Sequence, residues 1–446
     1  MKIVLISTYE LGRQPFGLAS PAAWLRAEGH EVTCADLACG PLPRAAVSEA
    51  DLVAFYLPMH TATRLAVQAL DRVRGLNPQA HLCCYGLYAP MNETYLRELG
   101  MQTILGGEFE QGLRDLARLL AAGTNGRQHE PLISLERQQF LVPDRSGLPS
   151  LSRYARLLVA SEEKVTGYTE ASRGCKHLCR HCPVVPVYNG TFRIVQRDVV
   201  LEDIRRQVAA GARHITFGDP DFFNGPGHAM ALVEDFHAEH PGHTYDVTIK
   251  IEHLLEHRGL LAGLKRTGCL FVTSAVESID DAVLEKLAKG HTRADFIEVV
   301  RIMRETGLTL APTLVTFTPW TTWEGYRELL KLLVNLDLVD NVGPIQLAMR
   351  LLIPAGSLLL ELDDIREIIG PFDPAALSYK WTHSDPSLDR LCADLQKMIQ
   401  REERQKSTRA EIFAKIWSMA HADSIPPDFH LTARAAIPYL NEPWYC

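Results

Sequence analysis

Three closely spaced cysteines in the middle of the chain place the strongest constraint on its fold. The segment from Arg173 to Pro183 reads RGCKHLCRHCP, so its thiols follow a C-x3-C-x2-C spacing. Thiolates at this spacing can bind three irons of a [4Fe–4S] cluster and leave the remaining iron open to another ligand. A zinc site completed by His177 or His181 is the alternative, because structural zinc takes four protein ligands. The metal ligands that the spacing predicts are Cys175, Cys179 and Cys182.

The composition is that of an ordinary globular protein. Of 446 residues, 46% are hydrophobic and 22% are charged, and the formal net charge of -8 argues against a nucleic acid bound to a basic surface. We find no signal peptide and no apolar run of about 18 residues, so we expect a cytoplasmic protein without a membrane partner. There the ten cysteines should stay reduced, with Cys83 and Cys84 in a core strand.

The first part of the chain alternates short apolar runs with helical patterns. This alternation predicts an α/β fold with a doubly wound, Rossmann-like parallel sheet. We assign residues 1–125 to this domain and residues 126–160, which are rich in turn-forming residues, to a linker. The predicted strands are Lys2–Ser7, Val32–Asp36, Leu52–Leu57, His81–Tyr85 and Thr103–Leu105, and the predicted helices are Ala19–Glu28, Thr63–Gly75 and Phe109–Ala121.

The alternation resumes in residues 161–362. About six βα units in one segment suit a partial (β/α)6 barrel, whose site lies at the carboxyl ends of its strands. Residues 363–446 are predicted to be mostly helical and to end in a thiol-bearing tail. The predicted barrel strands are Gly167–Ser172, His214–Gly218, Thr244–Ile251, Leu270–Ala275, Thr309–Phe317 and Pro344–Leu352.

The cysteine motif and the βα units after it resemble the radical S-adenosylmethionine (SAM) superfamily. The resemblance implies a [4Fe–4S] cluster whose open iron chelates the amino and carboxylate groups of SAM, and reductive cleavage of a carbon–sulfur bond. An electron donor such as flavodoxin or ferredoxin would be needed. The family usually has an aromatic residue before the third cysteine. Here that residue is His181, whose ring would lie against the adenine.

The end of the second predicted barrel strand carries a motif expected to bind SAM. The segment Phe217-Gly218-Asp219-Pro220-Asp221 resembles the Gly-Gly-Glu-Pro segment with which the family binds the methionine amino group. The resemblance assigns this contact to Gly218 and Asp219, with Asp221 as the substitute because Asp219 is shorter than glutamate. A turn-forming Asp-Pro pair is the alternative.

Three other strands offer polar residues for the same ligand. Glu277 and Ser278 close the fourth strand, where the resemblance implies contacts to the SAM ribose or carboxylate. Lys250 and Glu252 share one face of the third strand by the period of two, and either the barrel interior or a surface salt bridge accounts for them. Arg350 lies in an apolar strand, where a charge must be paired, so a carboxylate contact and a structural ion pair are both open.

The first domain resembles the cobalamin-binding-type domain that precedes many radical SAM barrels. The shared features are Asn77-Pro78, the Gly86 turn and the segment GGEFE (residues 106–110) before a helix. The Asp-x-His-x-x-Gly signature that supplies the lower cobalt ligand is missing, and His60 lies at a strand end outside that context. Fold resemblance alone establishes no cofactor. Cobalamin is therefore not the expected cofactor, although related domains bind it without a protein ligand.

The chain ends EPWYC, a tail that resembles one narrow radical SAM group, in which a second cysteine or selenocysteine often follows. That group includes the radical SAM enzymes of arsinothricin biosynthesis. The resemblance implies transfer of the 3-amino-3-carboxypropyl group of SAM to trivalent arsenic, with methylthioadenosine as the by-product. Arsenite, the implied small-molecule substrate, is thiophilic. The expected substrate-handling thiol is Cys446, with Cys269 and Cys392 as further candidates.

Two other functions remain open from the sequence. One is a cobalamin-dependent radical SAM methyltransferase or another enzyme that uses a 5′-deoxyadenosyl radical. The other is a metal-binding scaffold without turnover. Their signatures differ: methylthioadenosine for transfer to arsenic, S-adenosylhomocysteine for methyl transfer, and zinc without iron for the scaffold.

Overall fold

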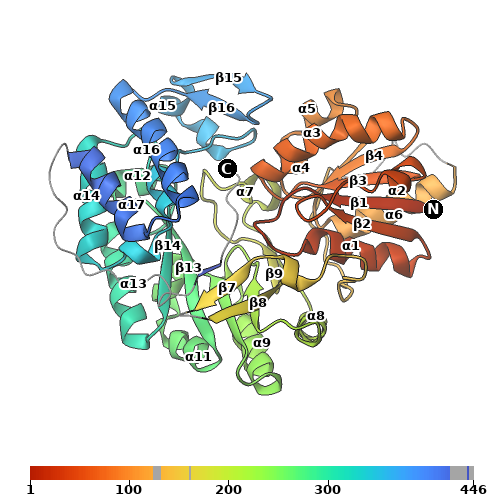
Figure 1. Ribbon diagram of the computed structural model, residues 1–446, viewed down its shortest axis with the longest axis horizontal. Coiled ribbons are helices and arrows are strands. Elements are labelled where there is room, and N and C mark those ends of the chain that lie inside the picture. Colours follow the sequence, from red (N-terminus) through yellow and green to blue (C-terminus); the bar gives the residue numbers. More distant parts are fainter. Residues whose placement is uncertain (124–131, 160–161, 422–438, 441–446) are drawn as a thin grey trace.

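A six-stranded parallel sheet forms the centre of the first domain in the computed structural model, which describes residues 1–123, 132–159, 162–421 and 439–440 (Figure 1). The strand order β2-β1-β3-β4-β5-β6 places β2 and β3 on opposite sides of β1, which confirms the predicted doubly wound character. The strands are β1 (Lys2–Ser7), β2 (Glu31–Asp36), β3 (Leu52–Tyr56), β4 (His81–Tyr85), β5 (Thr103–Gly107) and β6 (Ile133–Ser134).

Helices cover both faces of this sheet. Helices α1 (Phe16–Ala27) and α6 (Phe109–Ala121) pack on one face, and α3 (His60–Leu76) packs on the other. Because successive strand residues point to opposite faces, Cys83 joins the core under α1 and α6, and Cys84 joins the core under α3. Both lie in the core, as predicted. The short helices are α2 (Arg44–Ser48), α4 (Tyr88–Met91) and α5 (Glu93–Glu98).

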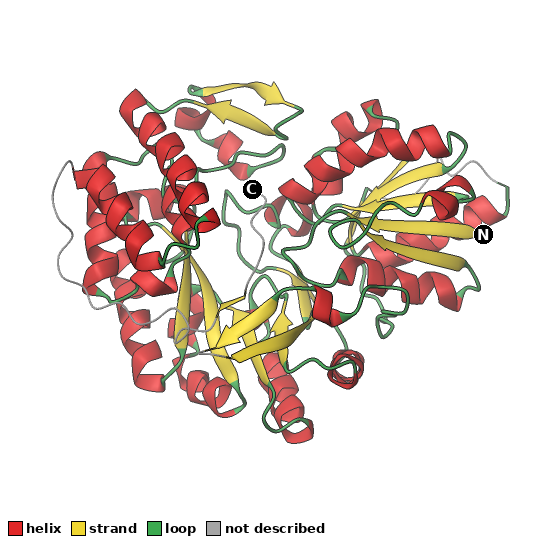
Figure 2. Cartoon of the chain, viewed as in Figure 1, coloured by secondary structure: helices red, strands yellow, loops and turns green. Residues whose placement is uncertain are grey.

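The second sheet is the predicted partial barrel, with the order β14-β13-β12-β11-β8-β7-β17 (Figure 2). Within this sheet β8, β11, β12, β13 and β14 pair in parallel. Strand β7 pairs antiparallel with β8, and β17 pairs antiparallel with β7. The strands are β7 (Arg156–Val159), β8 (Glu162–Thr169), β11 (His214–Phe217), β12 (Thr244–Thr248), β13 (Cys269–Glu277), β14 (Thr309–Leu314) and β17 (Tyr439–Leu440). The helices are α8 (Arg197–Ala209), α9 (Pro226–Glu239), α10 (Ile251–Glu256), α11 (Leu261–Arg266), α12 (Asp281–Lys286), α13 (Arg293–Thr306) and α14 (Trp323–Asn335).

The prediction of a sixth barrel strand over Pro344–Leu352 is wrong. A 3-10 helix occupies Pro344–Ala348. After it, a single parallel bridge pairs Arg350 with Phe317, which lies beyond the end of β14. The side-chain oxygen of Gln346 accepts the N–H of Leu314 at 3.0 Å, so a side chain takes the place of a strand partner there. Proline at the start of the segment also lacks the N–H that a strand ladder needs.

The segment predicted as a linker takes part in both sheets. Strand β6 pairs with β5 in the first sheet, and β7 pairs with β8 in the barrel sheet. After β8, a short antiparallel ribbon of β9 (Ser172–Gly174) and β10 (Phe192–Ile194) brackets the cluster loop, which we define as residues 175–182. Paired backbone therefore connects the first domain to the loop that carries the cysteines.

The described residues from 363 to 421 are helical apart from one hairpin that the sequence did not predict, β15 (Ile369–Asp373) with β16 (Ser378–Trp381). Its helices are α15 (Asp363–Arg366), α16 (Pro386–Arg404) and α17 (Arg409–His421). None of the described helices combines the length and the apolar character that a membrane span requires. The candidate thiol Cys446 lies outside the described residues.

Candidate active site

The three predicted metal ligands lie together on the cluster loop, between β9 and the short helix α7 (Val185–Tyr188). Cys179 is buried, and Cys175 and Cys182 are half-buried. The loop begins after Gly174, which has a φ of +74°, and a Cβ added there would lie 2.4 Å from the carbonyl oxygen of Thr191. Only glycine suits this turn. The N–H of Cys175 donates to the same carbonyl at 3.1 Å, so the start of the loop is fixed.

The thiols suit a cluster better than a single ion. Within the described chain, the ligand atoms found within 4.8 Å of one another are those of Cys175, His177 and Asp221, so the three cysteine sulfurs do not converge on one point. A cubane instead offers a separate iron to each thiolate. Burial raises the pKa of Cys182 to about 12, so metal binding must displace the protons. The zinc alternative would have to use Cys175 with His177 and Asp221.

Glu277, at the carboxyl end of β13, is a fixed anion beside the cluster loop. Its Oε1 lies 3.1 Å from Nε2 of His181 and 3.4 Å from Nζ of the buried Lys289. A register shift between β13 and β14 accompanies a φ of +66° at Glu277, a conformation that is costly for a residue with a Cβ. Burial alone would raise the pKa of this carboxyl, but Lys289 and His181 lower it to about 2.

The two aspartates after β11 have different surroundings. Asp219 accepts hydrogen bonds from Ser172 Oγ at 2.5 Å and Ala171 N at 2.9 Å, and burial raises its pKa to about 7. It therefore ties the end of β11 to the chain before the cluster loop. Asp221 is fully buried, and its Oδ2 lies 2.7 Å from Nδ1 of His253. Of the two, Asp221 is the carboxylate next to Cys175, and the substitute named from the sequence is the better placed.

Contact with Tyr168 explains why position 218 requires glycine. A Cβ at this position would lie 1.8 Å from the hydroxyl of Tyr168. Ser278 likewise has a local partner, because its hydroxyl accepts the N–H of Asp280 at 3.0 Å and so supports the turn before α12. Both residues lie at strand ends, as expected. There Gly218 makes room for Tyr168, and Ser278 supports a turn.

Lys250 and Glu252 do not lie on a strand, which corrects that part of the prediction. Strand β12 ends at Thr248, Lys250 precedes α10, and Glu252 lies in the first turn of that helix. The Lys250 ammonium is buried and lies 3.2 Å from Glu252. His177 approaches from the cluster loop, 3.5 Å from Glu252, and burial together with Lys250 and His253 lowers its pKa to about 4. The buried ammonium of Lys250 therefore lies near the neutral imidazole of His177.

Arg350 forms the ion pair that was the alternative reading of the sequence. Its guanidinium lies 2.6 Å from Asp389 of α16, donates to the carbonyl of Trp381 at 2.7 Å, and stacks 3.5 Å from the Trp381 ring centroid. These contacts direct the guanidinium toward the C-terminal helices. Its ion-pair partner, Asp389, lies on α16.

The two internal thiols named from the sequence also lie away from the cluster loop. Cys269 starts β13, at the opposite end of that strand from Glu277, and its thiol donates to Phe271 O. Cys392 is buried in α16, and its thiol donates to Ala348 O. Both behave as small apolar core residues.

Two side chains that build the site were not among the predicted contacts. Lys289 becomes significant because the chain after α12 folds back onto Glu277. His253, on α10, lies 2.7 Å from Asp221 and 3.3 Å from His177. No spacing in the sequence marks either residue, since their partners are far away along the chain.

Aromatic side chains fill the edge of the first sheet where such folds bind ligands. With this strand order, the topological switch point lies between β1 and β3, and ligands usually occupy the crevice there. Tyr56, Tyr85 and Phe109 pack together at this edge, with centroids between 4.9 and 5.8 Å apart. Tyr85 donates to Gly17 O at 2.7 Å, and a Cβ on Gly17 would lie 2.2 Å from the Tyr56 ring. The chain itself therefore fills this crevice.

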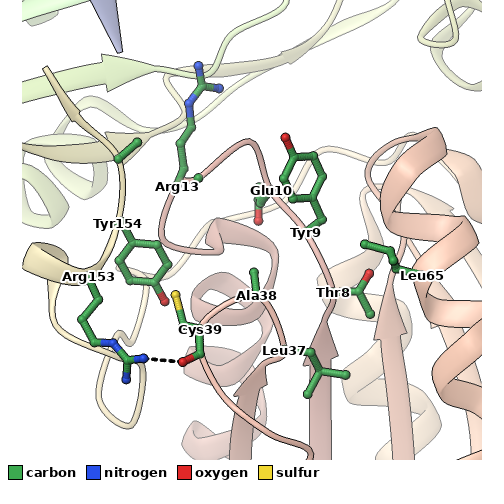
Figure 3. A pocket seen from close by; sticks show the side chains of 12 residues that line it. Thr8, Tyr9, Glu10, Arg13, Leu37, Ala38, Cys39, Leu65, Arg153 and Tyr154 are labelled. Carbon is green, nitrogen blue, oxygen red and sulfur yellow. Dashed lines mark hydrogen bonds between the residues drawn. The ribbon is translucent and has the colours of Figure 1, made fainter. Parts of the chain in front are cut away.

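A cavity of about 480 Å³ lies on the other side of β1, at the carboxyl ends of β1 and β2 (Figure 3). Glu10 and Arg13 line it from the loop after β1, and Cys39 lines it from the loop after β2. Arg153 and Tyr154 close it from the segment before β7, and Arg153 donates to the carbonyl of Cys39. Its volume suits a drug-sized molecule.

Residues 169–333 match the family model described as the Radical SAM superfamily. This segment is a radical SAM domain. It extends from the end of β8 into α14, and it contains the cluster loop and the strand ends that carry Asp221 and Glu277.

Characterised relatives resemble the chain over part of their length. It is 24% identical over 320 residues to hopanoid C-3 methylase of Methylococcus capsulatus, which covers 69% of this chain and 62% of that protein. It is 25% identical over 193 residues to tRNA-2-methylthio-N(6)-dimethylallyladenosine synthase of Desulfosudis oleivorans, covering 40% of this chain and 38% of that enzyme. The chain thus spans less than two thirds of each relative.

Solved structures share its fold. OxsB, a cobalamin-dependent SAM radical enzyme solved with aqua-cobalamin and SAM, has a TM-score of 0.72 at 15% identity and covers 90% of this chain and 66% of its own. The radical SAM methyltransferase TsrM from Kitasatospora setae, solved with tryptophan and a SAM analogue, has a TM-score of 0.63 at 18% identity and covers 85% of this chain and 82% of its own. At these identities the likeness shows the fold alone.

The first domain has no histidine in the Asp-x-His-x-x-Gly context that supplies the lower cobalt ligand. Tyr56 and Tyr85 pack in the core under α1 and α6, and the cavity at the ends of β1 and β2 has a volume of about 480 Å³. His60 is engaged elsewhere, because its Nε2 lies 2.6 Å from the carbonyl oxygen of Ala376. We therefore derive no reaction step through cobalamin.

We expect the protein to retain substoichiometric corrinoid when it is purified from cells that take up added cobalamin, since the first domain has no histidine in the Asp-x-His-x-x-Gly context that supplies the lower cobalt ligand. Corrinoid per chain can be measured by absorbance after conversion to the dicyano form. TsrM purified from the same cells is the positive control. One corrinoid per chain in the wild-type protein would contradict the expectation, and retention only after Tyr56→Ser with Tyr85→Ser would support it.

Proposed function

We propose that this chain is a radical SAM enzyme that cleaves SAM reductively and transfers a SAM-derived group to a small-molecule acceptor. One observation carries the proposal: three thiols share a loop that meets Glu277 and Asp221 at the strand ends of a radical SAM domain. The electron would come from a small redox protein such as flavodoxin or ferredoxin.

The residues around the loop have separate tasks in this proposal. A [4Fe–4S] cluster bound by the three cysteines supplies an open iron for the SAM amino and carboxylate groups and the electron for cleavage. Asp221, whose buried Oδ2 also lies 2.7 Å from His253, would accept from the N–H of the SAM amino group. Lys250 would hold the SAM carboxylate. Glu277, fixed by Lys289 and His181, would accept from the ribose hydroxyls.

Methyl transfer is the form of the reaction that the relatives support. Hopanoid C-3 methylase and TsrM are both named for methyl transfer, and both resemble this chain in sequence or fold. The sequence analysis gave a cobalamin-dependent methyltransferase as the alternative function, and we now propose methyl transfer as the first candidate reaction. The proposal is stated for transfer of a methyl group that SAM supplies, and no step is routed through cobalamin.

Aminocarboxypropyl transfer to trivalent arsenic is the second candidate. Its support is the tail sequence EPWYC, and the relatives reported above add none. Strand β17, which pairs with β7 at the edge of the barrel sheet, precedes that tail by a few residues. Cys446 remains its proposed substrate thiol, whereas Cys269 and Cys392 lie away from the site.

Product analysis after anaerobic reconstitution tests these proposals. The protein is incubated with SAM and a reductant, with and without arsenite, and nucleoside products are quantified. S-adenosylhomocysteine, alone or together with 5′-deoxyadenosine, indicates methyl transfer. Arsenite-dependent methylthioadenosine indicates aminocarboxypropyl transfer, and 5′-deoxyadenosine without S-adenosylhomocysteine indicates another adenosyl-radical reaction. Bound zinc without iron, and no cleavage of SAM, would overturn the proposal in favour of a scaffold.

A further inference from the structure

The guanidinium of Arg173, two residues before the first cysteine of the cluster loop, is buried among three carboxylates. It pairs bidentately with Glu110 at 2.6 and 2.9 Å, and Nη1 also lies 3.3 Å from Glu108. Its Nε donates to Glu170 at 2.7 Å. Arg173 is 6% exposed, and Glu108 and Glu110 are 1% and 0% exposed. A charge buried to this degree persists only with full pairing, which these contacts supply.

Two of the three carboxylate partners of Arg173 come from a different domain. Glu108 and Glu110 lie at the first turn of α6 in the first domain, whereas Arg173 lies on β9 at the entry of the cluster loop. Phe16 and Phe109 of the first domain lie 5.6 and 5.2 Å from the guanidinium carbon, so their rings enclose the same charge. The ion pair therefore crosses the boundary between the first domain and the barrel.

The exit of the cluster loop is attached to the same turn of α6. Tyr188, the last residue of α7, donates its hydroxyl to Glu108 Oε1 at 3.1 Å. Glu108 thus contacts Arg173 before the loop and Tyr188 after it. Burial, opposed by Arg173, raises the pKa of Glu108 to about 7, whereas the pKa of Glu110 is held low by Arg173 against the effect of burial. Glu110 is the ionised partner of the arginine.

We propose that the first domain acts as a clamp on the cluster loop, in which Glu108 and Glu110 hold Arg173 at its entry and Tyr188 at its exit. Arg173 and Tyr188 are then positioning residues. The inference rests on the proposed function, because it takes the loop to carry the cluster. Small displacements of reacting groups lower rates steeply, so a loosened clamp should slow SAM cleavage.

The reconstituted full-length enzyme with Glu110→Gln tests the clamp. We expect this variant to bind iron and sulfide as the wild type does, because the three thiols are intact. With SAM present, the electron paramagnetic resonance spectrum of the reduced protein should broaden or shift. The rate of SAM cleavage at saturation should fall roughly tenfold or more, and KM for SAM should change less. Tyr188→Phe, which removes one hydroxyl, should change the spectrum and the rate in the same direction by less.

Asp203→Asn is the matched control. Asp203 pairs with Arg145 at 2.8 Å, and this pair is comparably buried but does not contact the cluster loop. It should lower the midpoint of urea unfolding to a similar extent and leave the spectrum and the rate unchanged. A wild-type spectrum and rate in both Glu110→Gln and Tyr188→Phe, or equal changes in Asp203→Asn, would overturn the clamp alone. A wild-type protein that binds no iron would instead overturn the proposed function and the clamp with it.

Discussion

Cys179→Ala is expected to abolish reductive cleavage of SAM, with a loss of roughly 1,000-fold or more, the order seen when a residue essential to the reacting centre is removed. Cys179 is the buried member of the three thiols. Without it, the cluster keeps two thiolate ligands and one more iron opens to solvent, so we also expect iron and sulfide to fall well below the wild-type content after reconstitution. Iron, sulfide and nucleoside products are measured on the same anaerobic sample.

Cys84→Ala is the control for this loss. Cys84 is as deeply buried, but it lies in the core of the first domain under α3. The control removes a thiol and a little apolar packing, and it should retain the cluster and the rate. If Cys179→Ala kept wild-type iron and cleavage, the cluster could not be held as proposed. If both variants lost iron equally, the loss would reflect stability and not ligation.

The architecture was largely predictable because its strands are buried on both faces. Such strands appear as continuous apolar runs, and β1 and β4 were located to the residue. The run over Pro344–Leu352 is just as apolar but is buried as a 3-10 helix, because a side chain of Gln346 takes the strand partner's place. Apolar character predicts that a segment is buried, but it does not determine whether the buried backbone forms a strand or a helix.

The site was predictable only where its chemistry is local in sequence. The C-x3-C-x2-C motif identifies its own loop, and Glu277 follows directly from the end of an apolar strand. The sequence analysis ranked Asp219 before Asp221, but it had no access to their surroundings, which depend on Ser172 and His253 from other elements. The role of Arg173 was missed because two of its three carboxylate partners, Glu108 and Glu110, lie at the start of α6, some 60 residues earlier.

Glu277→Gln should destabilise the protein at neutral pH by about 3–5 kcal/mol, the cost of breaking a buried pair and leaving the other charge unpaired. Glutamine keeps the shape of the side chain but leaves Lys289, which is 3% exposed, without its anion. We also expect weaker binding of SAM, because the ribose would lose a charged acceptor. Urea unfolding and SAM titration of the reconstituted protein measure the two effects.

The pH dependence separates the charge of Glu277 from its packing. Its pKa is about 2 in the folded protein against an ordinary value of 4.5, so the ionised carboxylate stabilises the fold fully above pH 4.5. That contribution, on the order of 3 kcal/mol, is lost as the pH falls from 4.5 toward 2. The difference between wild type and Glu277→Gln should therefore be constant from pH 8 to 5 and narrow below 4.5. Glu298→Gln, at an exposed helix pair with Arg301, should show no such difference. A gap between wild type and Glu277→Gln that stayed constant down to pH 3 would mean that packing, and not the ion pair with Lys289, holds Glu277 in its strained position.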